Sequence, residues 1–336
     1  MKQNYRADIA ILRLLAILAV VAFHAYGMCY APAHLPSPLP QRYGDVYERF
    51  NQCGPINVAM PLFIFISGFL FFMQQAKGRY SSLFDVAKDK LARLCVPYYV
   101  FMVLMMATYS GFSWDVFYTG SYWHLWFLPA LWWCFIVTYL LSPIIHEGKW
   151  WQNIGLLCIL AGCMLVGRFL PRVFGLHHLN EMLYWFVLGA CYCRYENKMD
   201  RIFSSAYLVV PLLVVYLVTL LWSPTEYGDQ TLSFLVGSTS GILFLCYVFR
   251  RIAWQTFAVT PFLLSIVSCC YGVYIFHNWI EVFLVSSTAQ RLLPVASFAE
   301  HYVWLFPFLF TLSAFLVSVV LSKLLLMTRV GRMLIG

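Results

Sequence analysis

The chain has 336 residues, of which 62% are hydrophobic and 11% charged, and its formal net charge is +8. Soluble domains contain roughly 45–50% apolar and about 25% charged residues, so this composition excludes water as the main solvent. The positive charge does not indicate nucleic-acid binding, because the basic residues lie in short clusters beside apolar segments and form no continuous stripe.

Apolar segments long enough to cross a bilayer recur from residue 9 onward, since one crossing helix needs about 20 such residues. In chain order we predict ten transmembrane helices, near residues 9–29, 56–74, 94–111, 124–144, 154–171, 178–193, 205–222, 231–249, 261–284 and 302–326. The sixth is short and has Asn180 and Glu181 in its first turn, so it could be tilted or re-entrant. We expect one all-α membrane domain over residues 1–336, with helices around a polar pore and no soluble extra domain.

The orientation follows from the distribution of Lys and Arg in the loops. With the N-terminus inside, 16 of these residues lie on the cytoplasmic side and 5 on the outer side. Both termini are therefore expected in the cytoplasm. Cys29 and Cys53 flank the long first outer loop, residues 30–55, and whether they form a disulfide stays open.

Two ionisable side chains interrupt the first apolar segment, and such residues within a membrane indicate a functional site. Arg13 and His24 are eleven residues apart. In a helix they differ by only ~20° around the axis and by ~16 Å along it, so they share one face at different depths. The alternative is that Arg13 extends to the inner interface and that His24 is a packing residue.

Four further segments carry motifs in a fixed order after Arg13 and His24. They are Pro61–Phe69, which ends in Ser-Gly-Phe; Lys90–Tyr98, with paired basic residues before Pro and Tyr; His124–Leu128; and Tyr271–His277. With these five features the chain resembles the membrane-bound acyltransferase 3 family, whose members acylate surface polysaccharides, lipids and related acceptors. Two departures are Lys90, where many members carry Arg, and the lack of a C-terminal esterase-like domain. Ser67 and Gly68 are expected to allow close helix approach rather than chemistry.

The resemblance implies transfer of an acyl group, such as acetyl from acetyl-CoA, onto a hydroxyl or amine of an extracytoplasmic glycan or lipid-linked acceptor. It further implies a multi-pass protein of a bacterial inner membrane that O-acetylates polysaccharide of the cell envelope. Coenzyme A phosphates need cations at the cytoplasmic end, and four candidates lie there: Arg13, Lys88, Lys90 and Arg93. The catalytic candidates are His24 and Arg13. His24 would act as the general base, because its intrinsic pKa is near neutral.

Polar and aromatic residues of later segments are candidates for the acceptor site or the pore wall. His124 and Trp126 open the fourth helix, and Arg168 and Arg172 lie in an outer turn; ordinary interfacial positions are the alternative for all four. Another group occupies the ninth helix, where steps of three place residues on a common face. Its members are Tyr271, Tyr274, His277 and Glu281.

No metal site is expected, because His and Cys do not recur at ligand spacing, and the adjacent His177 and His178 are predicted to point apart. A transporter or flippase using the same polar pore without catalysis is the alternative function. The acceptor, the acyl length, a transient acyl-histidine intermediate and the oligomeric state stay open.

Overall fold

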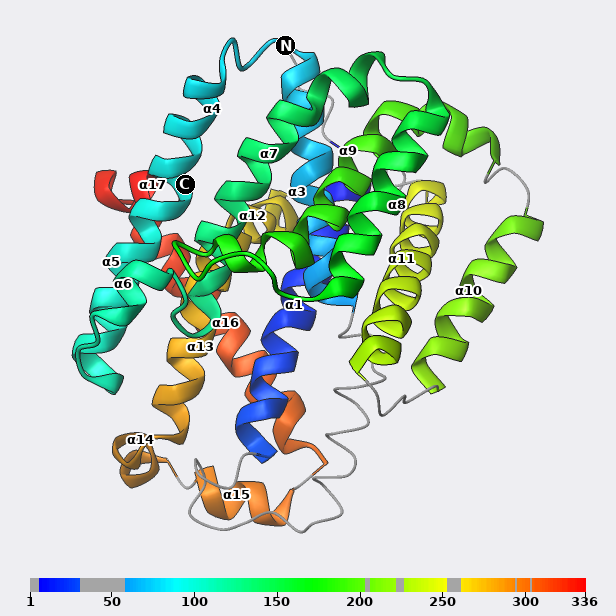
Figure 1. Cartoon of the computed structure of the whole chain (residues 1–336). Helices are drawn as coiled ribbons and strands as arrows, with labels where there is room; N and C mark the ends of the chain where they lie inside the picture. Colours follow the sequence, from blue (N-terminus) through cyan, green and yellow to red (C-terminus); the bar gives the residue numbers. More distant parts are fainter. Residues whose placement is uncertain are drawn as a thin grey trace. The chain divides into compact units, whose positions relative to one another are not determined.

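The computed structural model describes residues 6–30, 58–202, 206–221, 227–252, 261–293, 295–302 and 304–336. Within these ranges every regular element is a helix, and none is a strand (Figure 1). The pair Cys29 and Cys53 cannot be assessed, because the Cys29 side chain and all of Cys53 lie outside the part that is described. The chain forms two compact units, which we describe separately.

Six helices of the described part are long and apolar enough to cross a membrane, which confirms an all-helical membrane protein. They are Ala7–Gly27, Ala59–Ala76, Leu83–Thr108, Asp115–Glu147, Gln230–Arg251 and Phe306–Leu326. Three shorter apolar helices are Trp150–Val166, Val209–Leu221 and Cys270–Val285. The total of ten crossings therefore stays a prediction.

Unit 1 comprises Met1–Met60, Val218–Ser223 and Val248–Gly336, so it joins both ends of the chain. Its core is made by three mutually packed helices: α1 (Ala7–Tyr30), α13 (Cys270–Val285) and α16 (Phe306–Leu326). Figure 1 shows the first in blue and the other two in orange to red. The remaining helices are α12 (Pro261–Ser268), α14 (Ser287–Leu292), α15 (Val295–His301) and α17 (Arg329–Ile335).

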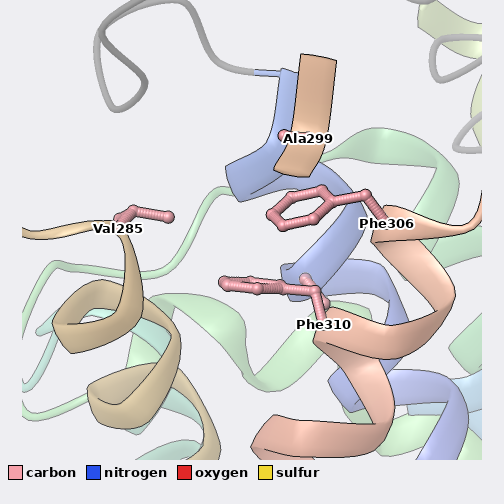
Figure 2. Packing of buried hydrophobic residues seen from close by; sticks show 5 residues of the cluster. Val285, Ala299, Phe306 and Phe310 are labelled. Atoms are coloured by element: carbon pink, nitrogen blue, oxygen red, sulfur yellow. The ribbon is translucent and has the colours of Figure 1, made fainter. Parts of the chain in front are cut away.

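Contacts at the two ends of unit 1 fix the directions of its core helices. Where α13 begins, Gly272 faces Ser322 near the end of α16, so closely that an added Cβ would clash with the serine side chain. At the other end, an apolar cluster joins three core helices and α15: its members are Ala25, Val285, Ala299, Phe306 and Phe310. In Figure 2 the two phenylalanine rings extend from α16 toward α13. Helices α1 and α13 therefore run in one direction and α16 in the opposite one.

Unit 2 comprises Pro61–Leu217 and Pro224–Tyr247. Within it α7 packs against α4, α8 and α9. Its α-helices are α3 (Ala59–Ala76), α4 (Leu83–Lys90), α5 (Val96–Met105), α6 (Asp115–Thr119), α7 (Phe127–Glu147), α8 (Trp150–Val166), α9 (Leu179–Ile202), α10 (Ala206–Leu221) and α11 (Tyr227–Arg251). Leu91–Cys95 and Met106–Ser110 are π-helical turns, and Trp123–Trp126 and Leu176–His178 are 3₁₀ turns.

Helices α3 and α9 approach each other at two glycines. A Cβ on Gly68 of α3 would clash with the backbone of Phe186, and one on Gly189 of α9 would clash with the backbone of Phe65. Small residues permit such close helix contacts in membrane proteins. This arrangement confirms the packing role predicted for Gly68, whereas the hydroxyl of Ser67 donates to the carbonyl of Phe63, 2.9 Å away in its own helix.

Candidate active site

Two histidines from opposite ends of the sequence meet inside unit 1. The ring centroids of His24 on α1 and His277 on α13 are 5.1 Å apart. His24 is partly accessible, whereas His277 is fully buried. The Nδ1 atom of His277 lies 3.0 Å from the carbonyl oxygen of Val273. Because a carbonyl only accepts, Nδ1 carries the proton and Nε2 of neutral His277 is left with a lone pair.

Arg13 lies on the same helix as His24, toward the end where α1 begins. The helix is continuous between the two residues, so the spacing of ~16 Å along the axis and the shared face are retained. Arg13 is partly buried, and it is close enough to Cys270, the first residue of α13, for its charge to act on the thiol. Arg13 and the histidine pair therefore lie at two different positions along the axis of the core helices of unit 1.

Helix α13 adds further buried polar groups beside the histidine pair. The ring of Tyr274 lies 6.1 Å from that of His277 between centroids, while Tyr271 is partly exposed. Glu281 follows His277 by one helical turn and is fully buried, and neither of its carboxylate oxygens has a hydrogen-bond partner among the described residues. Asn278 is also buried, and its amide oxygen likewise has no hydrogen-bond partner among the described residues. The sequence patterns did not predict a role for this residue. Polar side chains this costly to bury are typical of a functional site in a membrane protein.

The three predicted phosphate ligands of unit 2 differ in orientation. Lys90 is buried: its ammonium nitrogen lies 3.0 Å from Asp89 and over the rings of Tyr80 and Phe135, at 5.2 and 4.7 Å from their centroids. Arg93 is exposed, with its Nε 3.4 Å from Asp89, and Lys88 is exposed as well. Arg93 and Lys88 are thus directed outward, whereas Lys90 is held inside the unit.

A second group in unit 2 gathers around the loop between α8 and α9. The ring of Trp126 lies 4.1 Å from that of His178 between centroids. Arg168 forms a bidentate pair with Glu181, with distances of 2.7 and 3.1 Å, and Arg172 is exposed. His124 is buried in the 3₁₀ turn that leads to Trp126. Among the candidates the structure thus brings Trp126 into contact with a histidine and engages Arg168 in an ion pair.

The expectation that His177 and His178 point apart is wrong. Their rings lie 4.0 Å apart between centroids, because both residues belong to the 3₁₀ turn Leu176–His178 and are buried by their surroundings. The nitrogen Nε2 of His177 lies 3.1 Å from the hydroxyl of Ser121, far away in the sequence. Burial, together with the charges of His178, Arg168 and Arg172, lowers the pKa of His177 to about 4.

The same region contains strained backbone. Trp123 has a φ of 40°, in the left-handed region that large side chains rarely adopt. Its ring stacks on Tyr122, with centroids 5.7 Å apart and planes within 8°. Such strain costs about 1–3 kcal/mol and is concentrated at ligand sites. No sequence motif predicted the strained backbone at Trp123, because the φ angle depends on the surrounding structure.

The described residues contain no group of three or more His, Cys, Asp or Glu that could hold a metal ion. Long apolar helices, together with a buried cluster of histidine, carboxyl and tyrosine groups, are typical of polytopic membrane proteins with an internal polar site. A family model described as an acyltransferase domain matches residues 6–327, nearly the whole chain. The chain belongs to the acyltransferase 3 family and is an acyltransferase of the membrane. Comparisons with curated proteins and with solved structures find no match.

Proposed function

We propose that this acyltransferase moves an acyl group from cytoplasmic acyl-CoA to a hydroxyl or amine of an extracytoplasmic glycan or lipid-linked acceptor. The observation that carries the proposal is the contact between His24 and His277, with rings 5.1 Å apart, on the helix face that also bears Arg13. A partly accessible imidazole beside a second, buried one is suited to receive a proton from an acceptor. Family membership favours this function over a transporter that uses the same groups without catalysis.

In the proposed reaction, His24 takes the proton of the acceptor hydroxyl while the hydroxyl oxygen attacks the thioester carbonyl. The carbon–sulfur bond then breaks, and the coenzyme A thiolate leaves and receives the proton from His24. His277 faces the ring of His24 and helps to hold its position. The alternative mechanism has two steps. His24 first accepts the acyl group and coenzyme A leaves, and the acceptor then reacts with the acyl-histidine.

The cations that we propose for the donor phosphates are Arg13, Lys88 and Arg93. Their exposure supports this role for the last two, since an accessible cation can form charge-assisted bonds with phosphate. Lys90 belongs to the same set, and its buried ion pair with Asp89 favours a supporting contribution, in which it fixes the carboxylate that also contacts Arg93.

For the acceptor we propose two sets of residues, each taken by itself: one lies around the α8–α9 loop and the other on α13. Trp126 offers a ring on which a sugar can stack, and exposed Arg172 offers charge for an anionic group. The other proposed members are His124, Arg168, Tyr271, Tyr274, His277 and Glu281. The simplest case is transfer of an acetyl group to envelope polysaccharide in a bacterial inner membrane.

The test compares three variants of the purified protein with acetyl-CoA as donor and an envelope glycan fraction as acceptor. His24→Ala is expected to lose 10²–10⁴-fold in transfer, the usual contribution of a positioned base, while affinity for coenzyme A stays within a few-fold. His277→Asn can still donate a hydrogen bond to Val273 but lacks the second ring nitrogen, and it is expected to lose part of the rate.

His301→Ala removes an exposed histidine of unit 1 and serves as the matched control, with unchanged transfer. Transfer by folded His24→Ala at the wild-type rate would remove His24 as the base. It would also remove the main support for the proposed reaction.

A further inference from the structure

An apolar pocket of about 310 Å³ opens at the end of unit 1 beyond the histidine pair. Its wall comes from the end of α13, the segment before α15, α15 itself and the beginning of α16. The residues that define it are Leu284, Val295, Phe298, Phe306, Leu309 and Phe310. Leu293 and Ser313 complete the lining. Phe306 and Phe310, labelled in Figure 2, line the pocket and also belong to the apolar cluster of the unit.

The pocket borders the apolar cluster that adjoins the candidate active site. Ala25, the residue after His24, belongs to the apolar cluster with Val285, Phe306 and Phe310. Leu284 follows His277 by seven residues, so in α13 it lies on nearly the same face and ~10 Å further along the axis. The order along unit 1 is therefore the Arg13 cation, the histidine pair and then the apolar pocket.

This order matches the order of chemical groups in an extended acyl-CoA. Its phosphates belong with Arg13 and its thioester with His24, and the acyl chain follows the thioester on the side away from the phosphates. An acetyl group ends in a single methyl and would leave the pocket unused. A water molecule occupies about 30 Å³ and a methylene is of similar size, so the pocket has room for on the order of ten carbon atoms.

We propose that this pocket binds the acyl chain of the donor and that the enzyme prefers chains longer than acetyl. The inference rests on the proposed function, because it requires the thioester to lie at His24. Each methylene that enters an apolar pocket strengthens binding roughly four-fold, equivalent to ~0.8 kcal/mol. A chain of about eight carbons is expected to bind on the order of 10²–10³-fold more tightly than acetyl, allowing for incomplete burial at the mouth.

The experiment measures the affinities of two non-transferable thioethers, S-ethyl-CoA and S-octyl-CoA, by calorimetry on the full chain in lipid nanodiscs. Leu309→Trp and Ser313→Trp place an indole in the pocket from two positions on α16. Leu312→Trp adds the same bulk to the exposed side of that helix, outside the pocket, and is the matched control. The preference for S-octyl-CoA is expected in the wild type and in Leu312→Trp, and it should fall to a few-fold in both pocket variants.

Equal affinity for the two thioethers in the wild type would overturn the proposal. The same octyl preference in all four proteins would also overturn it, because the chain would then be partitioning into lipid. If the pocket variants keep the octyl preference but lose binding of a polyprenyl phosphate, the occupant is the acceptor's lipid and not the donor's chain. Failure of the proposed function has a different signature: neither thioether binds, or His24→Ala transfers acyl groups normally.

Discussion

Arg13 and Arg93 are two of the cations that we propose for the donor phosphates. Replacing either with alanine removes charge-assisted bonds to phosphate, which contribute about 1.5–3 kcal/mol each. We therefore expect Arg13→Ala and Arg93→Ala to weaken coenzyme A binding by roughly ten- to a hundred-fold in a calorimetric titration. Arg291→Ala, an exposed cation of α14 at the opposite end of α13 from Arg13, is the control with unchanged affinity. Unaltered binding by both site variants would exclude them from the donor site.

The lowered pKa of His177 predicts a pH dependence of stability. Burial and nearby positive charges favour neutral His177 in the folded protein, with a pKa of about 4, whereas the unfolded chain has the ordinary value near 6.5. Between these values the unfolded state binds more protons, so the free energy of unfolding falls as pH drops from about 6.5 to 4.

Thermal unfolding of the purified protein at pH 7.5 and pH 4.5 checks this prediction by comparing the wild type with His177→Gln. The variant keeps a side chain able to hydrogen-bond Ser121 but has no proton to bind in this range. It is expected to lose less of its melting temperature on acidification than the wild type. An identical loss in both proteins would show that His177 does not titrate as described.

The sequence predicted part of the candidate site, and the missing part has a physical reason. Helical periodicity placed Arg13 and His24 on one face without knowledge of any other helix. The contact of His24 with His277 depends on which helices are neighbours, and no pattern within either segment encodes that. The inward orientation of Lys90 likewise follows from Asp89 and the rings of Tyr80 and Phe135, which surround it only after folding.

Among the helices, the contact of α3 with α9 makes the sharpest stability prediction. Gly68→Ala and Gly189→Ala each push a methyl group into the backbone of the opposite helix. Overpacking of this kind costs typically 1–3 kcal/mol, so both variants should unfold at lower temperature. The control is Gly162→Ala in α8, where an added Cβ meets nothing within 4 Å. Alanine favours the helix there by roughly 1 kcal/mol.

Differential scanning fluorimetry of the three glycine variants in one detergent gives the comparison. Gly162→Ala is expected to match or exceed the wild-type melting temperature, whereas Gly68→Ala and Gly189→Ala fall below it. If all three variants have the same melting temperature, α3 and α9 do not pack closely enough at these glycines to exclude a methyl group.

Hydropathy predicted the positions of the helices more accurately than the positions where a helix is interrupted. Helices lie within all ten predicted ranges, but the predicted ninth one is divided into α12 and α13 at Cys269. There the amide of Cys269 donates a hydrogen bond to the carbonyl of Ile266, three residues earlier. The hydroxyl of Ser268 donates to the carbonyl of Ser265, also three residues earlier. Such a tightened turn is invisible to a hydropathy window, because every residue around it stays apolar or small.

For the whole molecule, the structure and the charges together predict the orientation in the membrane. Within unit 1, α1 begins at the end where α16 finishes, which supports the expectation that both termini lie on one side of the membrane. The Lys and Arg distribution of 16 against 5 then favours the cytoplasm. Reporter fusions after residues 115 and 336 are expected to report opposite sides, the first outside and the second inside. Reports from the same side would contradict the orientation and the number of crossings between them.

The joining of α1 with α13 and α16 also determines when the proposed site is completed during synthesis of the chain. His24 leaves the ribosome about 250 residues before His277, which at 5–20 residues per second is a delay of roughly 13–50 s. During that time α1 is in the membrane without the two helices that complete its core, and its Arg13 and His24 face lipid or provisional neighbours. The proposed site is thus complete only after the last helices insert, so we expect a nascent chain or a C-terminally truncated product to be inactive.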